Sequence, residues 1–324
     1  MGAFRARALS GHPEVEQVIV GSHDRDRALA ISHEIGGLPG TIDEVLSEQL
    51  DALVISTVTA EHPKHIAAGA RRGLAMLCEK PISIDLADTE ATVELVRDAG
   101  VELQIAFMRR FDPGFRRARE LISGGTLGTL YSVRMCAHDH EPADERFIAT
   151  SGGIFCDLHV HDFDMARWLT GQEVREVYAI GAVRAWDRYG RQGDVDTAAM
   201  VLTMEDGLPI VVTGARHDPL GYDFRAEVLG SGDSIVVGVN DRTPVRSVER
   251  GGPPPPADPY TGFLDRFREA FAAETDRFIQ VALGRATNPC PPEEALRAQR
   301  VAVACERAWR ERRPVQLEEV PSLG

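Results

Sequence analysis

The sequence predicts a doubly wound, parallel α/β domain followed by an α+β domain with a mainly antiparallel sheet. Up to about residue 107, short apolar runs alternate with segments of helical periodicity, a pattern typical of a parallel sheet covered by helices on both faces. After about residue 125, segments rich in Val, Thr and Tyr follow one another with turn residues between them, as antiparallel strands do. We expect the first domain over residues 1–108 and the second over residues 109–324.

In the first domain, each expected strand is an apolar run and each expected helix ends at a glycine. The runs are Gln17–Gly21, Ala52–Thr57, Ala75–Cys78 and Glu102–Phe107, and the helices are Arg25–Ile35, His62–Arg72 and Leu86–Ala99. Gly36, Gly73 and Gly100 follow these helices, and glycine is favoured there because it readily adopts the left-handed conformation. Ligands bind such sheets at the carboxyl ends of the strands.

The second domain is expected to combine six extended segments with three helices. The extended segments are 129–138, 174–186, 195–205, 208–216, 222–229 and 234–239, and the helices are Gly153–Leu169, Gly262–Leu283 and Pro292–Arg310. The cleft between the two domains is the expected ligand site.

Composition excludes several classes of protein. The 324 residues are 43% hydrophobic and 27% charged, as in globular proteins, and no apolar run approaches the roughly 18 residues of a membrane helix. A net charge of −14 disfavours nucleic-acid and membrane partners. The five cysteines form no CxxC pair and the amino terminus lacks a signal-peptide pattern, so we expect reduced thiols and a cytoplasmic protein.

Chemistry-bearing residues gather in one expected helix of the second domain. Asp157, His161, Asp164 and Trp168 are spaced i, i+4, i+7 and i+11, so in a continuous helix they share one face. A carboxylate one turn from an imidazole orients it and raises its basicity, which suits a general acid or base. The alternative is ordinary ion pairing at a solvated helix start. Since His159 and His161 point to different faces, we expect no metal site.

Other polar residues follow the ends of expected strands. Lys80 comes shortly after an apolar run, and a cis bond to Pro81 is compatible with the turn there; the alternative is a solvated lysine in an ordinary turn. Arg109 and Arg110 end the last parallel strand, where an arginine can bind a polyhydroxylated or anionic ligand or simply be solvated. His138 lies on a strand, facing either the cleft or solvent.

Three motifs occur in order along the chain: EKPIS at 79–83, FMRRFDPGF at 107–115 and GGIFCDLHVHDFDMARWLTG at 152–171. Together they resemble the Gfo/Idh/MocA oxidoreductases over essentially the whole chain. With Gly221-Tyr222-Asp223, the sequence is most similar to the inositol 2-dehydrogenase branch. The resemblance implies a Rossmann domain and an open-faced sheet whose outer side forms homodimers or homotetramers.

The resemblance also implies roles for individual residues. The catalytic residues are Lys80, Asp157 and His161, and the positions that line a polyol pocket are Arg109, His138, Asp164 and Tyr222. Cofactor contacts fall on Gly2, Ser22, His23, Arg25, Thr57, Glu79 and Lys80. In the implied reaction, His161 takes the hydroxyl proton as hydride leaves for a nicotinamide, Asp157 stabilises the imidazolium, and Lys80 hydrogen-bonds the same oxygen.

Two departures from the family pattern concern the cofactor. The ribose-binding position is usually acidic, but here it is Ser22, with His23 and Arg25 close by. A hydroxyl beside potential cations suits a 2′-phosphate, so the cofactor is expected to be NAD or NADP, with NADP tolerated or preferred.

The second departure is at the start of the chain. Met1-Gly2-Ala3-Phe4-Arg5 matches only the end of the G-x-G-x-x-G fingerprint, with Gly2 as its third glycine. We expect the natural start to lie about a dozen residues upstream, the length of a strand and turn in such folds. The alternative is a shortened protein that binds cofactor poorly or not at all.

The expected activity is oxidation of a cyclic polyol, myo-inositol or a near relative. Residues 138–142 depart from the inositol-dehydrogenase pattern, so an aldose or another sugar stays an alternative substrate. Relatives in the family also include NAD-using glycosidases and non-catalytic, cofactor-sensing regulators. Retention of Lys80, Asp157 and His161 favours an enzyme over a regulator.

Overall fold

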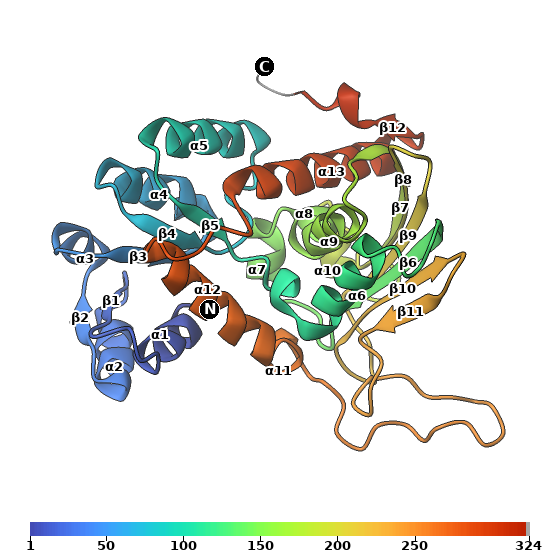
Figure 1. The fold of residues 1–324 in the computed structure, drawn as a ribbon, viewed down its shortest axis with the longest axis horizontal. Helices are drawn as coiled ribbons and strands as arrows, with labels where there is room; N and C mark the ends of the chain where they lie inside the picture. Colours follow the sequence, from blue (N-terminus) through green and yellow to red (C-terminus); the bar gives the residue numbers. More distant parts are fainter. Residues whose placement is uncertain (322–324) are drawn as a thin grey trace. The chain divides into compact units, whose positions relative to one another are not determined.

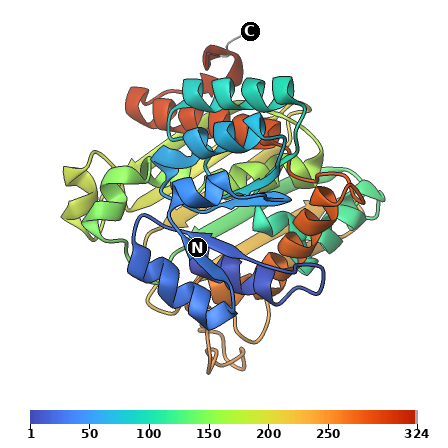
Figure 2. The same cartoon turned by 90° about the vertical axis from the view of Figure 1, so that its left-hand side faces the viewer.

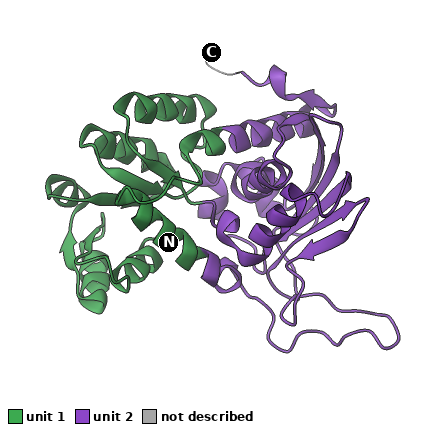
Figure 3. Ribbon diagram, in the orientation of Figure 1, with its two compact units in different colours: residues 1–106, 271–296 green, residues 107–270, 297–324 purple. Residues whose placement is uncertain are grey.

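A computed structural model describes residues 1–321, and the chain folds into two compact units (Figure 3). Unit 1 comprises residues 1–106 and 271–296, and unit 2 comprises residues 107–270 and 297–321. The chain thus first leaves unit 1 close to the predicted boundary. The prediction did not group residues 271–296 with the first domain; they pack there because Phe278 shares a buried cluster with Leu77 and Ala106.

Unit 1 contains two parallel sheets (Figure 2). One pairs β1 (Ile19–Gly21) with β2 (Leu38–Gly40), and the other has the order β3 (Ala52–Ile55), β4 (Ala75–Cys78), β5 (Leu103–Ile105). In the Rossmann order 3-2-1-4-5-6, these sheets correspond to strands 3-2 and 4-5-6. Residues 1–321 provide no strand at the central first position, in agreement with the sequence prediction. The strand β2 was not predicted.

The helices of unit 1 begin and end where local side chains favour it. They are α1 (Gly2–Ser10), α2 (Arg25–Ile35), α3 (Ile42–Ser47), η1 (Thr59–Glu61), α4 (His62–Arg71), α5 (Leu86–Ala99) and most of α12 (Arg268–Ala282). The carboxylates of Asp24 and Asp85 accept backbone N–H groups at the starts of α2 and α5. Gly36 and Gly100 end these helices with φ of 69° and 64°, which confirms the predicted stops.

Unit 2 is built on a seven-stranded sheet in the order β11-β10-β6-β9-β8-β7-β12. Its strands are β6 (Leu130–His138), β7 (Val174–Ala182), β8 (Thr197–Met204), β9 (Pro209–Ala215), β10 (Asp223–Gly230), β11 (Ser234–Val237) and β12 (Val315–Gln316). All neighbours are antiparallel except β6 and β9, which are parallel. The predicted, largely antiparallel sheet is therefore confirmed.

One face of this sheet is covered by helices and the other is open (Figure 1). The helical elements of unit 2 are η2 (Met108–Phe111), α6 (Pro113–Ser123), α7 (Glu145–Thr150), α8 (Gly153–Asp157), α9 (Val160–Thr170), α10 (Asp187–Arg191), α11 (Phe263–Arg266), most of α13 (Pro292–Glu311) and η3 (Leu317–Glu319). Along β8, Met200 and Leu202 are buried, whereas Val201 between them is 43% exposed. This alternation shows that the sheet is covered on one face only.

The prediction of one helix over Gly153–Leu169 is wrong, because α8 and α9 are separate. At their junction, the His159 N–H donates to the carbonyl of Ile154, five residues back, and this wide turn interrupts the regular ladder. Asp157 ends α8 and His161 lies in the first turn of α9, so the single-face argument does not apply to Asp157. The predicted helix Gly262–Leu283 is likewise divided into α11 and α12.

No helix within residues 1–321 is long and apolar enough to cross a membrane.

Candidate active site

In unit 1, the motif Glu79-Lys80-Pro81 forms a turn at the carboxyl end of β4. The Lys80-Pro81 peptide bond is cis, in agreement with the sequence analysis. The Glu79 N–H donates to the carbonyl of Ile55 at the end of β3. The buried His62 lies on the other side, with Nδ1 2.9 Å from the Pro81 carbonyl oxygen and Nε2 3.1 Å from that of Thr57. The turn that carries Lys80 is thus held to the neighbouring strand end.

A buried charge cluster lies behind this turn. Arg5 on α1 contacts Glu79 at 2.9 Å and Glu274 on α12 at 2.6 Å, and the Arg5 and Glu274 side chains are only 2% and 0% exposed. Burial raises the pKa of Glu274 to about 7, although Arg5 acts in the opposite direction. Sequence reasoning missed Arg5 and Glu274, since neither belongs to a motif. Glu79, predicted as a cofactor contact, has Arg5 as its partner.

The other predicted cofactor residues follow strand ends or begin a helix in unit 1. A Cβ at Gly2 would lie 3.8 Å from the Cβ of Ser56, so α1 begins beside the end of β3. Met1 provides no side-chain cap for α1, which leaves its first N–H groups suited to a phosphate. Ser22 follows β1 and Thr57 follows β3 closely. These donors and their positions fit a dinucleotide.

His23, which follows Ser22 in the sequence, has an acidic partner. Its Nε2 lies 2.8 Å from Glu61 Oε1, and this contact is the largest cause that lowers the pKa of Glu61. Arg25 is exposed at the start of α2. The predicted 2′-phosphate seat therefore contains a carboxylate as well as cations.

In unit 2, the predicted catalytic pair lies at the junction of α8 and α9. The side chain of His161 is 8% exposed, and its ring meets that of Phe107 edge-on, with centroids 5.8 Å apart. Asp157 Oδ2 lies 2.8 Å from Nη1 of Arg216, which follows β9. The same Nη1 lies 3.4 Å from Asp139. The sequence analysis missed Arg216, because it stands 59 positions from Asp157.

The two arginines of the FMRRFD motif are buried and paired with carboxylates of α9. Arg109 Nη1 lies 2.5 Å from Asp162 Oδ1, and Arg110 Nη2 lies 2.6 Å from Asp164 Oδ1. The other oxygen of Asp162 is 2.8 Å from His159 Nδ1, and Arg109 also stacks 4.4 Å from the Phe224 ring centroid. Arg109 and Asp164, both predicted to bind substrate, thus each have a protein partner. Their role as substrate contacts stays a prediction.

The remaining predicted substrate residues lie around β6 and β10. Tyr222 is 6% exposed and stacks on Phe224, and burial raises the pKa of its hydroxyl. His138 Nδ1 lies 3.4 Å from Asp218 and 3.9 Å from Asp223. Because side chains alternate along a strand, His138 shares the open face of β6 with Cys136. The structure therefore places Tyr222 in the core and His138 at the open face.

Within residues 1–321, the group of metal-ligating side chains close enough to share an ion is Cys136, His138 and Asp223, all within 4.8 Å of one another. The Asp223 carboxylate is already bound by Arg225 at 2.8 Å, and burial raises the pKa of the Cys136 thiol to about 12.

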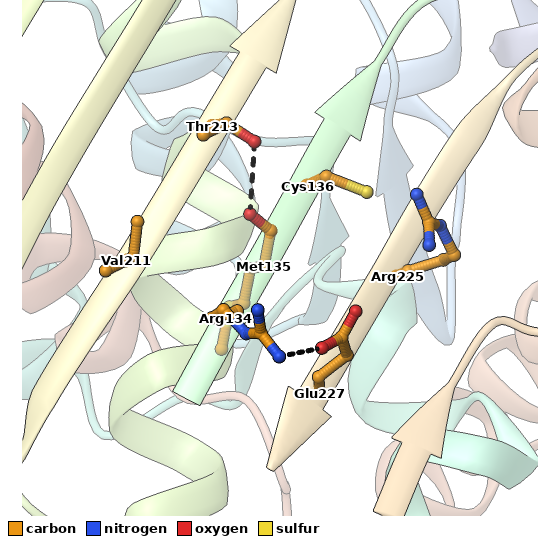
Figure 4. Close-up of a pocket in the computed structure, with 7 residues that line it drawn as sticks. All are labelled: Arg134, Met135, Cys136, Val211, Thr213, Arg225 and Glu227. Carbon is orange, nitrogen blue, oxygen red and sulfur yellow. Dashed lines mark hydrogen bonds and ion pairs between the residues drawn. The ribbon is translucent and has the colours of Figure 1, made fainter. Parts of the chain in front are cut away.

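A pocket of about 180 Å³ adjoins these residues on the open face of the sheet (Figure 4). It is lined by Arg134, Met135, Cys136, Val211, Thr213, Arg225 and Glu227. Arg134 and Glu227 pair across it at 2.7 Å. The pocket is thus part of the open sheet face and contains none of the residues predicted to act in catalysis.

The chain is similar to known proteins along both of its units. Residues 1–107 match the family model described as "Oxidoreductase family, NAD-binding Rossmann fold", and residues 115–236 match that of the GFO/IDH/MocA C-terminal domain. The chain is 34% identical to inositol 2-dehydrogenase of Rhizobium meliloti over 98% of this chain and 96% of that protein. It is 36% identical to myo-inositol 2-dehydrogenase of Thermotoga maritima over 84% and 81%, respectively.

The fold is also similar to a crystal structure of scyllo-inositol dehydrogenase from Lactobacillus casei with bound NAD(H) and scyllo-inositol. That structure has a TM-score of 0.87 and 25% sequence identity, and the match covers 98% of this chain and 96% of that one.

Proposed function

Because the chain belongs to the Gfo/Idh/MocA family of oxidoreductases, with its NAD-binding Rossmann domain, we propose that it oxidises a ring hydroxyl of a cyclic polyol, myo-inositol or a near relative. The observation that carries this proposal is the similarity, along nearly the whole chain, to relatives named inositol dehydrogenases. The ionised pair of Asp157 with Arg216 beside the junction that carries His161 supports it chemically.

In this reaction His161 accepts the proton of the substrate hydroxyl. The Asp157 carboxylate stabilises the imidazolium that forms, and Lys80 donates a hydrogen bond to the substrate oxygen as negative charge develops on it. NAD, when bound, supplies the hydride acceptor. The α1 amino terminus and the polar residues after β1, β3 and β4 would hold it.

The test is a panel of inositols, sugar alcohols and aldoses with NAD and with NADP, followed by the absorbance of reduced cofactor. We expect turnover with at least one inositol, and His161→Gln and Lys80→Ala should each lower kcat by about 10²–10⁴-fold. His33→Gln and Lys64→Ala, at exposed positions, are the matched controls and should keep wild-type rates. Near-normal turnover of His161→Gln or Lys80→Ala would contradict the assigned roles.

The same panel separates the alternatives. Faster oxidation of an aldose than of any inositol favours the sugar dehydrogenase. Hydrolysis of a glycoside without net formation of reduced cofactor indicates an NAD-using glycosidase. Cofactor binding without turnover of any substrate indicates a regulator.

We also propose that NADP is tolerated, since Ser22 replaces the usual acidic residue. The Glu61 carboxylate beside His23 opposes a 2′-phosphate, so the two features compete. In the panel, measurable kcat/KM with NADP supports tolerance, and turnover with NAD alone contradicts it.

We further propose a homodimer or homotetramer formed through the open sheet face of unit 2. The large apolar side chains exposed on this face are Tyr178, Ile180, Val201, Val211, Leu229 and Val236. An apolar surface on one face of a sheet is typical of an interface between subunits. The five free cysteines support a cytoplasmic location for the enzyme.

A further inference from the structure

Arg216 is a buried cation that the sequence motifs do not include. It follows β9, and its backbone N–H donates to the carbonyl of Asp196 at 2.8 Å. Two residues earlier, a Cβ at Gly214 would lie only 2.0 Å from His159 Nε2, so β9 passes directly beneath the junction of α8 and α9. This close approach brings Arg216 next to the end of α8.

Arg216 is the cation for a group of acidic side chains. Its side chain is 3% exposed and lies 2.8 Å from Asp157 and 3.4 Å from Asp139. Burial lowers the pKa of Arg216, but Asp157 and Asp139 raise it by more, so the guanidinium stays charged. The charge of Asp194 also raises the pKa of Arg216. Burial raises the pKa of the Asp194 carboxyl itself. The Tyr189 hydroxyl also lies close enough to Arg216, Arg188 and Asp139 for their charges to act on it.

On the basis of the function proposed above, we propose that Arg216 is a positioning residue that keeps the Asp157 carboxylate charged and in place for His161. Without Arg216, Asp157 would lose this cation while the carboxylates of Asp139 and Asp194 remained close by. Neighbouring negative charges and poor solvation both raise the pKa of a carboxyl group, so Asp157 would take up a proton more readily. A protonated Asp157 no longer stabilises an imidazolium at His161.

The kinetic test is the pH profile of kcat/KM for the best polyol. Removing Arg216 raises the pKa of Asp157, whose charged form the reaction needs, so Arg216→Gln should move the acid limb to higher pH by about one unit. Arg216→Lys keeps the charge and should keep the limb of the wild type. Asp139→Asn removes a negative charge and should move the limb to lower pH; it also serves if Arg216→Gln does not fold.

Arg167→Gln is the matched control. Arg167 is a buried arginine on α9, with a side chain 4% exposed, that pairs with Glu173 at 2.6 Å. We expect this variant to be less stable and to keep the wild-type limb. If Arg216→Gln lowered the rate equally at every pH, or if neither Arg216→Gln nor Asp139→Asn moved the limb, Arg216 would be a structural residue only and the proposal would be overturned.

A second measurement separates this inference from the proposed function. The imidazole of His161, assigned by loss of its signal in His161→Gln, is titrated by NMR in the wild type and in Arg216→Gln. We expect its pKa to be lower in Arg216→Gln, because a protonated Asp157 no longer stabilises the imidazolium. An unchanged or raised pKa overturns the role of Arg216, whereas a lowered pKa in a protein that oxidises no polyol overturns only the proposed function.

Discussion

Buried arginines form ion pairs with several of the acidic residues of unit 2. Arg109, Arg110 and Arg216 each pair with a carboxylate of α8 or α9, and all three are less than 7% exposed. Two consecutive arginines of η2 thereby bind Asp162 and Asp164, which lie two positions apart on α9. The FMRRFD motif has a structural use, whatever contact Arg109 makes with a ligand.

A prediction at this scale concerns the pair of Arg110 with Asp164. Arg110→Met leaves a buried carboxylate without its cation, so the free energy of unfolding should fall by about 3–5 kcal/mol. The double variant Arg110→Met/Asp164→Leu removes both charges and should regain much of that loss. Urea unfolding of both variants measures the effect.

The control for this prediction is Arg117→Met, which breaks the pair with Glu120 on the surface, where the two side chains are 67% and 59% exposed. It should change stability little. If Asp164→Asn raised KM for the polyol while leaving the unfolding curve unchanged, Asp164 would be a substrate contact and the structural role would be secondary.

At the scale of elements, α12 is the segment that the sequence analysis grouped with the wrong part of the chain. Its Phe278 and Glu274 complete unit 1, the first in the apolar core and the second beside Arg5. Helix α12 therefore supports the turn that carries Lys80 through Arg5 and Glu79.

A prediction follows for the pH dependence of stability. The pKa of Glu274 is raised from 4.5 to about 7 in the folded protein, so folding favours its protonated form. Its contribution to stability is fully present below about pH 4.5 and is lost as pH rises through about 7, a change of about 3 kcal/mol. Glu274→Gln cannot ionise, so this loss between pH 5 and pH 8 should disappear from its urea unfolding.

The matched control is Glu34→Gln, which replaces an exposed glutamate that pairs with Arg7. It should show the same decrease in stability between pH 5 and pH 8 as the wild type. An equal decrease in Glu274→Gln would show that another group takes up the proton.

At the scale of the whole molecule, the open sheet of unit 2 predicts self-association. In sedimentation analysis the wild type should have a mass of about two or four times the 35.4 kDa of one chain, as expected for a homodimer or homotetramer. Val201→Glu places a charge on the open face and should shift the protein toward monomers. Val248→Glu, at a loop position that is 90% exposed, should not. A monomeric wild type would contradict the proposed interface.

The sequence was most informative where the signal is local. The glycines that end α2 and α5 and the extended segment that forms β8 each depend on residues a few positions apart. The α8–α9 break was missed, because its wide turn accommodates the packing of His159 against β9, and periodicity does not report that contact.

By itself, the sequence determined the fold class and the family, because strand, helix and motif signals act over short distances along the chain. It also predicted which residues carry acid–base chemistry. Only the tertiary structure decided the partners of those residues. Arg216 meets Asp157 across 59 positions, and Arg5 meets Glu79 across 74. A buried charge is stable only beside an opposite charge, and which opposite charge lies beside it depends on the packing of elements that are distant in the sequence.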